Sequence, residues 1–285
     1  MNKVTRLKYY IESLCIYDFE DDDVFSALYD LLCDDEEDTV ALQSYFFKEL
    51  AKSESLKRHV SRLILTNDNI FTKAACAGKV NELSIAVINA VKSDLAKLEE
   101  IASLTAQDIL ADIDDEDIKE ILLTLPGWEV GKPLAPLDSH WDRQLDELIK
   151  YHRENGYGIY AKNIAFTWRN EEITPVNSID PIRLTDLKNY ELQRNKVIDN
   201  TESFIAGHPA NNVLLYGDRG TGKSSTVHAI LNEYWQKGLR MIEIPKSAVA
   251  DLSLIREQIA DSPMKFIIYI DDLSFNSNDT SFSEL

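Results

Sequence analysis

The fold of this chain is decided by the stretch Val213-Leu214-Leu215-Tyr216-Gly217-Asp218-Arg219-Gly220-Thr221-Gly222-Lys223-Ser224-Ser225. It contains an apolar run, then a Gly-x-x-x-x-Gly-Lys-Ser turn, then a helix-compatible segment, which is the order that a phosphate-binding P-loop requires. Glycines let successive backbone N–H groups of the turn point inward, and the following helix adds unpaired donors and partial positive charge. The stretch therefore predicts a strand, a phosphate-binding turn and a helix.

Each residue of this Walker A pattern receives a predicted role. Contacts with the phosphates of ATP are expected for Gly217, Asp218, Arg219, Gly220, Thr221, Gly222, Lys223, Ser224 and Ser225. Lys223 is expected to reach the β- and γ-phosphates and to act in catalysis, and the Ser224 hydroxyl is expected to hold Mg²⁺. The alternative is a glycine-rich turn that carries Lys and Ser by chance. The apolar run before the turn and the helical pattern after it favour the functional interpretation.

The second half of such a site is predicted at 266–272, an apolar segment that ends in two carboxylates and is typical of Walker B. A strand that is apolar on both faces is expected in the middle of a parallel sheet, where ligands bind at the carboxyl ends of the strands. Asp271 is expected to hold Mg²⁺ opposite Ser224. Asp272 is expected to polarise the attacking water as a catalytic base, a role for which the longer Glu is usual. Without the turn at 217–222, a buried strand followed by an acidic turn would be the better interpretation.

Composition and charge describe an ordinary soluble globular protein with an acidic surface. Apolar residues make up 44% and charged residues 28% of the 285 residues, and the net charge is −19. Residues 1–140 hold 14 Lys and Arg against 28 Asp and Glu, which disfavours direct nucleic-acid binding by this half. The acidic clusters at 20–23, 34–38 and 114–116 are interpreted as solvated helix ends and loops, or alternatively as contacts for a basic partner.

The same sequence indicates a cytoplasmic protein. Three cysteines, at 15, 33 and 76, form no Cys-x-x-Cys pair and are interpreted as reduced thiols. No apolar run has the length needed to span a bilayer, and acidic residues interrupt any signal-peptide core, so no membrane association is expected. The five histidines show no metal-ligand spacing.

The pattern along the chain predicts an all-α N-terminal domain followed by an α/β part. Residues 1–125 are helical by periodicity, most clearly where Leu83, Val87, Val91, Leu95 and Leu98 form one stripe. The predicted domains are residues 1–137 as a helical domain, 138–180 as a helix with a β-rich connector, and 181–285 as a partial ATPase core. From 213 onward the predicted order is β-α-β-α-β. A guanine-reading Asn-Lys-x-Asp is disfavoured, because the segment at 195–199 is one residue too long and precedes the turn.

Four segments give the chain a resemblance to a known family. These are Leu184-x-x-Leu187-x-x-Tyr190-x-x-Gln193, Asn211 to Gly217 with the following turn, Gly238 to Ile244, and Ile270 to Phe275. From about residue 145 to 285 the sequence resembles the bacterial ATP-binding proteins grouped as domain of unknown function 815, which are AAA+-like. The resemblance implies ATP binding and hydrolysis, a P-loop NTPase fold with a parallel sheet, and an adenine pocket lined by Leu184, Leu187 and Tyr190.

The resemblance also implies that the chain is truncated at its C-terminus. AAA+ proteins continue beyond the second motif with a polar sensor, an arginine finger and a helical lid, whereas this sequence stops at Leu285. In similar folds the missing strand lies between the turn's strand and the Asp271 strand, so both are expected to leave ladder groups unpaired. We accordingly expect an incomplete sheet with an exposed apolar edge, and no meaningful ATP hydrolysis by residues 1–285 alone.

Three functions are compatible with these patterns. The first is an AAA+-like ATPase, expected to form homo-oligomers when complete, that couples nucleotide state to a protein partner through its helical N-terminal domain. The second is a P-loop phosphotransferase, which the paired aspartates disfavour because they fit water activation better than acceptor recognition. The third is a nucleotide-gated adaptor that binds ATP without hydrolysis. Release of free phosphate would indicate the ATPase, a phosphorylated acceptor would indicate the phosphotransferase, and tight ATP binding without turnover would indicate the adaptor.

Overall fold

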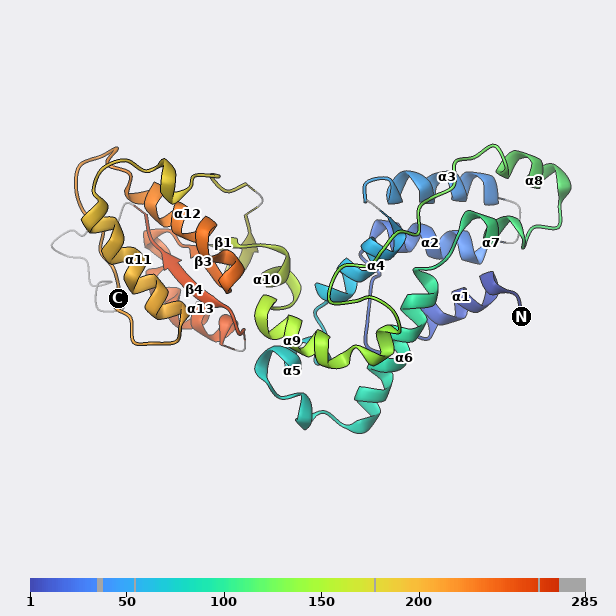
Figure 1. Cartoon of the computed structure of the whole chain (residues 1–285), viewed down its shortest axis with the longest axis horizontal. Coiled ribbons are helices and arrows are strands. Elements are labelled where there is room, and N and C mark those ends of the chain that lie inside the picture. The colour runs from blue at the N-terminus through green and yellow to red at the C-terminus, as the bar shows by residue number, and fades with distance from the viewer. Residues whose placement is uncertain (35–37, 54, 177, 261, 272–285) are drawn as a thin grey trace. The chain divides into compact units, whose positions relative to one another are not determined.

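The computed structural model describes residues 1–34, 38–53, 55–176, 178–260 and 262–271. The chain forms two compact units, Met1–His152 and Arg153–Leu285, and each has its own core. The described part of the first unit contains helices and no strand, whereas the second contains a small mixed sheet with helices on both faces (Figure 1). The general α/β fold class that the sequence predicts is therefore confirmed. The segment 138–180, predicted as one connector, is divided between the two units.

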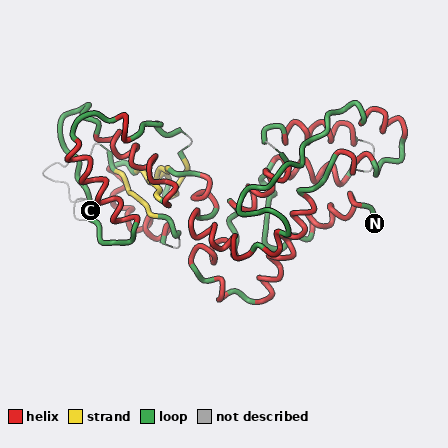
Figure 2. The backbone as a smooth tube through the Cα atoms, in the orientation of Figure 1, coloured by secondary structure: helices red, strands yellow, loops and turns green. Residues whose placement is uncertain are grey.

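The first unit is built from helices joined by turns and by longer loops, the longest of which runs from Leu122 to Trp141 (Figure 2). Its helices are α1 (Lys3–Glu12), α2 (Asp23–Cys33), α3 (Thr39–Leu50), α4 (Leu56–Leu65), α5 (Ile70–Ala77), α6 (Ile85–Ile101), α7 (Ala106–Leu110) and α8 (Glu116–Leu122), with 3-10 turns at Val80–Glu82 and Trp141–Arg143. Helix α9 (Leu145–Asn155) begins in this unit. The helical character predicted for residues 1–125 is thus confirmed.

Helix α6 shows how the sequence pattern becomes a core. The Ser84 side chain caps its first turn by accepting the Val87 N–H, as expected of a residue that favours helix N-termini. Val91, Leu95 and Leu98 are fully buried, because their spacing places them on one face of the helix. They pack in the main cluster of the unit, whose largest fully buried side chains include Trp141, Phe46 and Phe71.

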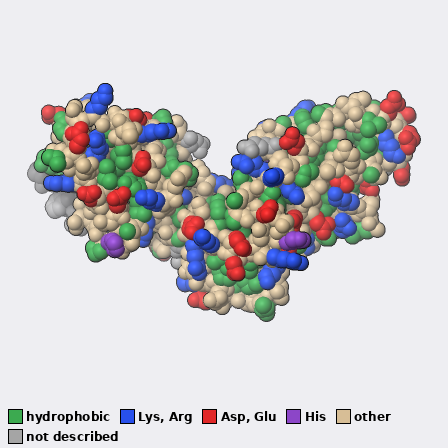
Figure 3. Space-filling view, in the orientation of Figure 1, with side chains coloured by type: hydrophobic (Ala, Val, Ile, Leu, Met, Phe, Trp, Pro, Cys, Tyr) green, Lys and Arg blue, Asp and Glu red, His purple; other side chains and the backbone are tan. Residues whose placement is uncertain are grey.

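Two of the three acidic clusters, at 20–23 and 114–116, lie at helix N-termini, as one of the two sequence interpretations predicts, whereas the cluster at 34–38 lies partly outside the described residues. Asp22 caps α2 by accepting the Phe25 N–H, and Asp115 caps α8 by accepting the N–H groups of Asp117 and Ile118. Carboxylates at these positions stabilise the helix by satisfying unpaired donors and by favourable interaction with the helix dipole. Acidic side chains gather around α8 at the surface (Figure 3).

A buried carboxylate joins the loop after α1 to helix α6. Asp94 is fully buried, and its Oδ2 accepts N–H bonds from Cys15 (2.9 Å), Ile16 (2.7 Å) and Tyr17 (3.3 Å). The Lys97 ammonium lies 3.7 Å from Asp94 Oδ1. Burial, together with the Asp94 charge, raises the pKa of the Tyr17 hydroxyl well above its ordinary value. Three backbone donors of one loop therefore depend on a single side chain.

A second polar contact joins α2 to α4. Asp22 Oδ1, besides capping α2, lies 2.8 Å from His59 Nε2, and His59 Nδ1 lies 2.8 Å from Ser53 Oγ. Burial alone would raise the pKa of the Asp22 carboxyl. Hydrogen bonds from His59 and from the Phe25 and Val24 N–H groups outweigh burial and bring this pKa below its ordinary value of 3.8.

We expect the Asp22 contact to make the first unit sensitive to acid. A carboxyl whose pKa is lowered by folding stabilises the protein above its unfolded-state pKa, and this stabilisation is lost as the pH falls through the folded-state pKa. Asp22→Asn, which keeps a good capping residue, should lower stability at pH 7 and flatten the dependence of stability on pH below 3.8. The midpoints of urea unfolding, determined for both proteins from pH 7 to pH 2.5, measure this dependence of stability on pH. An equal acid dependence in both proteins would contradict it.

The second unit is a four-stranded mixed sheet in the order β2-β1-β3-β4. Its strands are β1 (Ala165–Arg169), β2 (Glu172–Pro175), β3 (Leu239–Glu243) and β4 (Lys265–Tyr269). Strands β1, β3 and β4 are parallel, and β2 is antiparallel to β1 in a hairpin within the predicted β-rich connector. The helices are α10 (Gly158–Lys162), α11 (Glu191–Ile205), α12 (Lys223–Tyr234) and α13 (Leu252–Ile259), with 3-10 turns at Leu184–Asp186, Trp235–Lys237 and Lys246–Asp251.

Alternate strand residues build a separate cluster on each face of the sheet. One cluster packs Phe166, Ile242 and Ile268 against α13, and the other packs Met241 and Ile267 against α12 and α11. Both faces are therefore covered by helices, as expected for a parallel sheet.

Two predictions about the sheet are wrong. Residues 213–216 form no strand, and Val213, Leu214 and Tyr216 are 48%, 72% and 89% exposed. An apolar run becomes a strand only where a neighbouring strand pairs with it, and this run has no place in the ladder of the described sheet. Strand β4, predicted at the centre, lies at an edge with all its residues half-buried. The hairpin, predicted as a connector, instead contributes β1 to the interior of the sheet.

Among the described residues, no helix combines the length and the apolar composition that crossing a membrane requires.

Candidate functional site

The glycine-rich turn at 217–222 leads directly into helix α12. Gly222 is the N-cap of α12 at φ 82°, and Gly220 has φ 80°. Side chains larger than glycine seldom adopt this left-handed backbone, so the two glycines are needed for the course of the turn. The hydroxyl of Thr221 donates to the Asp218 carbonyl (2.9 Å) and closes the turn. The N-terminal N–H groups of α12 thus follow the turn without a side-chain cap, free for an anionic ligand.

The side chain of Lys223 folds back over this turn. Its Nζ donates to the carbonyl oxygens of Gly217 (3.0 Å) and Asp218 (2.8 Å). These contacts are exposed, so the ammonium stays accessible to a ligand approaching the turn. Asp218 and Arg219 are also exposed, and Ser225 is half-buried in the first turn of α12. The turn therefore gathers a cation and helix N–H donors at one place.

Ser224 and Asp271, which are 47 positions apart in the sequence, come together at the end of β4. The Ser224 hydroxyl donates to the Asp271 carboxylate, with Oγ 3.2 Å from Oδ2 and 3.4 Å from Oδ1. The pairing predicted from the two motifs is therefore present. A hydroxyl and a carboxylate this close offer the hard oxygen ligands that Mg²⁺ prefers, with room for ligand oxygens and water to complete its shell.

Tyr269 is part of this cluster, although the sequence interpretation missed it. Its ring meets the His228 ring of α12 at 6.2 Å and 76°. Burial is the main cause that raises the pKa of Tyr269 to about 12; Ser224 opposes this increase, and Asp271 and Glu243 add to it. The available signal was its position as the last residue of β4, two residues before Asp271.

The predicted adenine segment packs on α12. Leu184 joins the apolar cluster on this face, and the Asn232 side chain donates to the carbonyls of Asp180 (2.8 Å) and Ile182 (2.9 Å). Asn232 lies about two turns beyond Ser224, so these contacts hold the segment against the far half of the helix. The Leu187 carbonyl accepts from Arg194 (2.9 Å), and Tyr190 is 54% exposed at the N-cap of α11.

Two remaining predictions concern the metal and the base. Asp272 lies outside the described residues. Among the residues that the structure does describe, no three His, Cys, Asp or Glu side chains gather as metal ligands. A metal at Ser224 and Asp271 would therefore take its other ligands from a bound phosphate group and water, which is the usual situation of Mg²⁺ in nucleotide sites.

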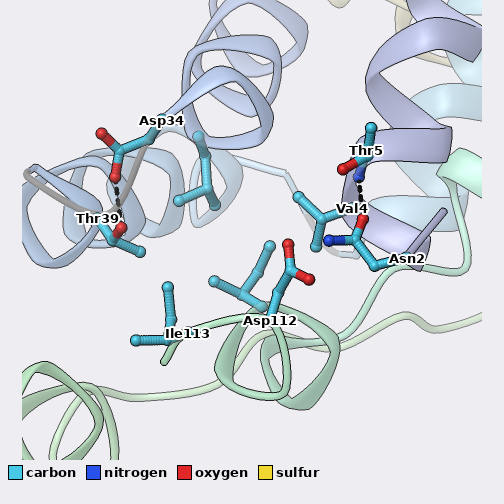
Figure 4. A pocket seen from close by; sticks show the side chains of 9 residues that line it. Asn2, Val4, Thr5, Asp34, Thr39, Asp112 and Ile113 are labelled. Atoms are coloured by element: carbon cyan, nitrogen blue, oxygen red, sulfur yellow. Dashed lines mark hydrogen bonds between the residues drawn. The ribbon is translucent and has the colours of Figure 1, made fainter. Parts of the chain in front are cut away.

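A hollow of about 350 Å³ lies in the first unit. Its lining combines carboxylates, small polar groups and aliphatic side chains, and consists of Asn2, Val4, Thr5, Leu31, Asp34, Thr39, Ile109, Asp112 and Ile113 (Figure 4). The Thr39 hydroxyl donates to Asp34, and the Asn2 side chain accepts the Thr5 N–H at 2.8 Å. The turn at 217–222, which brings a lysine, a hydroxyl and a carboxylate to one helix N-terminus, is the better candidate for chemistry.

Fold and geometry together define an α/β unit in which a glycine-rich turn, a lysine and a strand-end carboxylate meet at one helix N-terminus. A family model described as "Protein of unknown function (DUF815)" matches residues 161–285. The match supports the family resemblance seen in the sequence over this part of the chain. No curated protein and no solved structure gives a significant match.

Proposed function

We propose that the chain binds ATP with Mg²⁺ at the turn 217–222, as an AAA+-like P-loop protein. The observation that carries the proposal is the contact between Ser224 and Asp271, with Oγ 3.2 Å from Oδ2. Chance resemblance of the turn to a Walker A sequence would not bring its serine to a carboxylate at the end of a parallel strand. That arrangement is what a magnesium–phosphate site needs.

The proposed binding mode assigns a role to each group. Backbone N–H groups of the turn and of the first turn of α12 would hold the phosphates, and the helix dipole would favour their negative charge. Lys223 would exchange its contacts with the Gly217 and Asp218 carbonyls for phosphate oxygens. Ser224 and Asp271 would hold Mg²⁺, which neutralises charge between the phosphates. Leu184, Leu187 and Tyr190 are proposed to contact the adenine.

Hydrolysis is the proposed reaction, with Asp272 orienting and deprotonating the attacking water. The nucleotide state would be read by a protein partner through the helical first unit, whose acidic charge favours a basic partner over nucleic acid. A cytoplasmic location and assembly into homo-oligomers belong to the same proposal. The nucleotide-gated adaptor is the alternative if Asp272 is too short to act on water, whereas no contact in the described site favours a phosphotransferase.

Asp271→Asn and Asp272→Asn separate the two proposed carboxylate roles. Asp271→Asn is expected to weaken Mg²⁺-dependent ATP binding by about tenfold or more, since even outer-shell partners of metal ligands contribute that much. In the full-length protein, Asp272→Asn is expected to lower turnover with little loss of ATP affinity, because the side chain acts on water. Magnesium titrations with a fluorescent ATP analogue and phosphate release measure the two effects.

Asp199→Asn is the control, because it removes one exposed carboxylate from α11 of the same unit. This control should change neither the Mg²⁺-dependent ATP affinity nor the turnover. Equal weakening of binding by Asp271→Asn and Asp272→Asn would show that the roles are assigned wrongly. Absence of Mg²⁺-dependent nucleotide binding in the unchanged protein would refute the proposed function itself.

A further inference from the structure

The inference concerns Asn232, a half-buried side chain of the helix that begins at the glycine-rich turn. Its amide nitrogen donates to the carbonyl oxygens of Asp180 (2.8 Å) and Ile182 (2.9 Å). A primary amide carries two N–H donors, which match these two acceptors. The acceptors lie 52 and 50 positions earlier in the chain, so a single side chain attaches a distant segment to α12.

The attached stretch, residues 180–190, is called the adenine segment here, because it contains the three residues proposed to contact the base. Its Leu184 packs against the same apolar cluster as Val227 of α12. Near the other end, the Arg194 guanidinium donates to the Leu187 carbonyl (2.9 Å). Between these attachments Leu187 is half-buried, and Tyr190 is 54% exposed. Side chains of two helices therefore hold the segment, while apolar and aromatic surface on it stays accessible.

Helix α12 connects the adenine segment to the candidate phosphate site. Asn232 follows Ser224 by eight residues, which corresponds to a rise of about 12 Å along the helix. Between them and the end of the helix, Ile230 and Leu231 are almost fully buried against the sheet, so the helix is firmly packed. One helix therefore sets the position of the adenine segment relative to the turn at 217–222.

We propose that Asn232 is a positioning residue for the nucleotide base: by holding residues 180–182 against α12, it keeps the adenine segment formed before the nucleotide arrives. This inference rests on the proposed function. Ordering a loop and its side chains during binding lowers affinity, and a segment that is already held in place avoids this loss. The effect should concern the base alone, because the Asn232 amide contacts no residue of the turn.

The test is Asn232→Leu, which removes both N–H donors, keeps a side chain of similar size and adds no charge. Leucine has the higher helix propensity, so α12 itself should not be weakened. The affinity for ATP with Mg²⁺ should fall about tenfold, which corresponds to the cost of ordering one or two side chains. The affinity for inorganic tripolyphosphate with Mg²⁺, which offers phosphates and no base, should be unchanged. Isothermal titration measures both affinities.

Asn163→Leu is the matched control. The Asn163 amide, in the same unit, donates to the Ile159 carbonyl (3.1 Å) within its own turn, so its loss should change neither affinity. Unchanged ATP affinity in Asn232→Leu would overturn the inference. An equal loss of affinity for ATP and for tripolyphosphate would also overturn it, because it would mean that Asn232 supports the fold in general. If the unchanged protein binds neither compound, the proposed function is refuted, and the inference with it.

Discussion

Lys223→Ala is expected to abolish ATP binding, with a loss of affinity of about 100-fold or more, which corresponds to about 2.7 kcal/mol. The Lys223 ammonium now contacts only weak acceptors, the Gly217 and Asp218 carbonyls, at an exposed position. Phosphate oxygens carry full charge, and charge-assisted hydrogen bonds are about twice as strong as neutral ones. The hydrogen bonds of the ammonium therefore become much stronger when it moves from the carbonyls to a triphosphate.

The fold should tolerate this change, because the two contacts that it removes are exposed and local. Isothermal titration with ATP and Mg²⁺ measures the affinity, and a thermal scan verifies that the unfolding temperature is kept. Lys237→Ala is the charge-matched control, since Lys237 lies over the Tyr234 ring just after the far end of α12. Unchanged affinity in Lys223→Ala would remove the basis for a nucleotide site at this turn.

Asp94→Ala is expected to destabilise the first unit by about 3 kcal/mol or more. The change removes the common acceptor of the Cys15, Ile16 and Tyr17 N–H groups. A buried donor that loses its partner costs about 1–3 kcal/mol, which applies to the Tyr17 N–H, whereas the partly exposed N–H groups of Cys15 and Ile16 cost less. It also leaves the Lys97 ammonium without the carboxylate 3.7 Å away. The loop after α1 would then lose its attachment to α6.

Native-state hydrogen exchange followed by mass spectrometry is the suitable measurement, because it reports each unit separately in a chain of two compact units. Peptides from 1–152 should lose protection, and peptides from 153–271 should not. Asp68→Ala removes an exposed ion pair with Lys73 (2.8 Å) and should cost less than about 1 kcal/mol. A similarly small effect of both changes would show that Asp94 does not hold the loop.

Local patterns in the sequence predicted much of the architecture. The stripe at Val91, Leu95 and Leu98 gives α6 because a helical period is visible within one segment. The pairing of Ser224 with Asp271 was also predictable, since each motif fixes its side chain at the start of a helix or the end of a strand. The adenine contacts of Leu184, Leu187 and Tyr190 remain predictions.

Non-local pairing is what the sequence did not reveal. Residues 213–216 have the composition of a buried strand, yet a strand needs a partner, and composition does not identify one. The same reason explains why β4 was predicted at the centre of the sheet and β1 outside it. Tyr269 was missed because its ring contact, His228, belongs to another element, α12.

The exposed course of residues 213–216 has a thermodynamic consequence for any ligand of the turn that follows. Helix α12 is anchored by Ile230 and Leu231, which are almost fully buried, whereas the residues before the turn contribute few buried contacts. Segments of this kind have low local stability. Part of the free energy of ligand binding would therefore be used to order the chain before Gly217. The measured affinity would then be lower than that of a turn that makes the same ligand contacts but is already ordered without ligand.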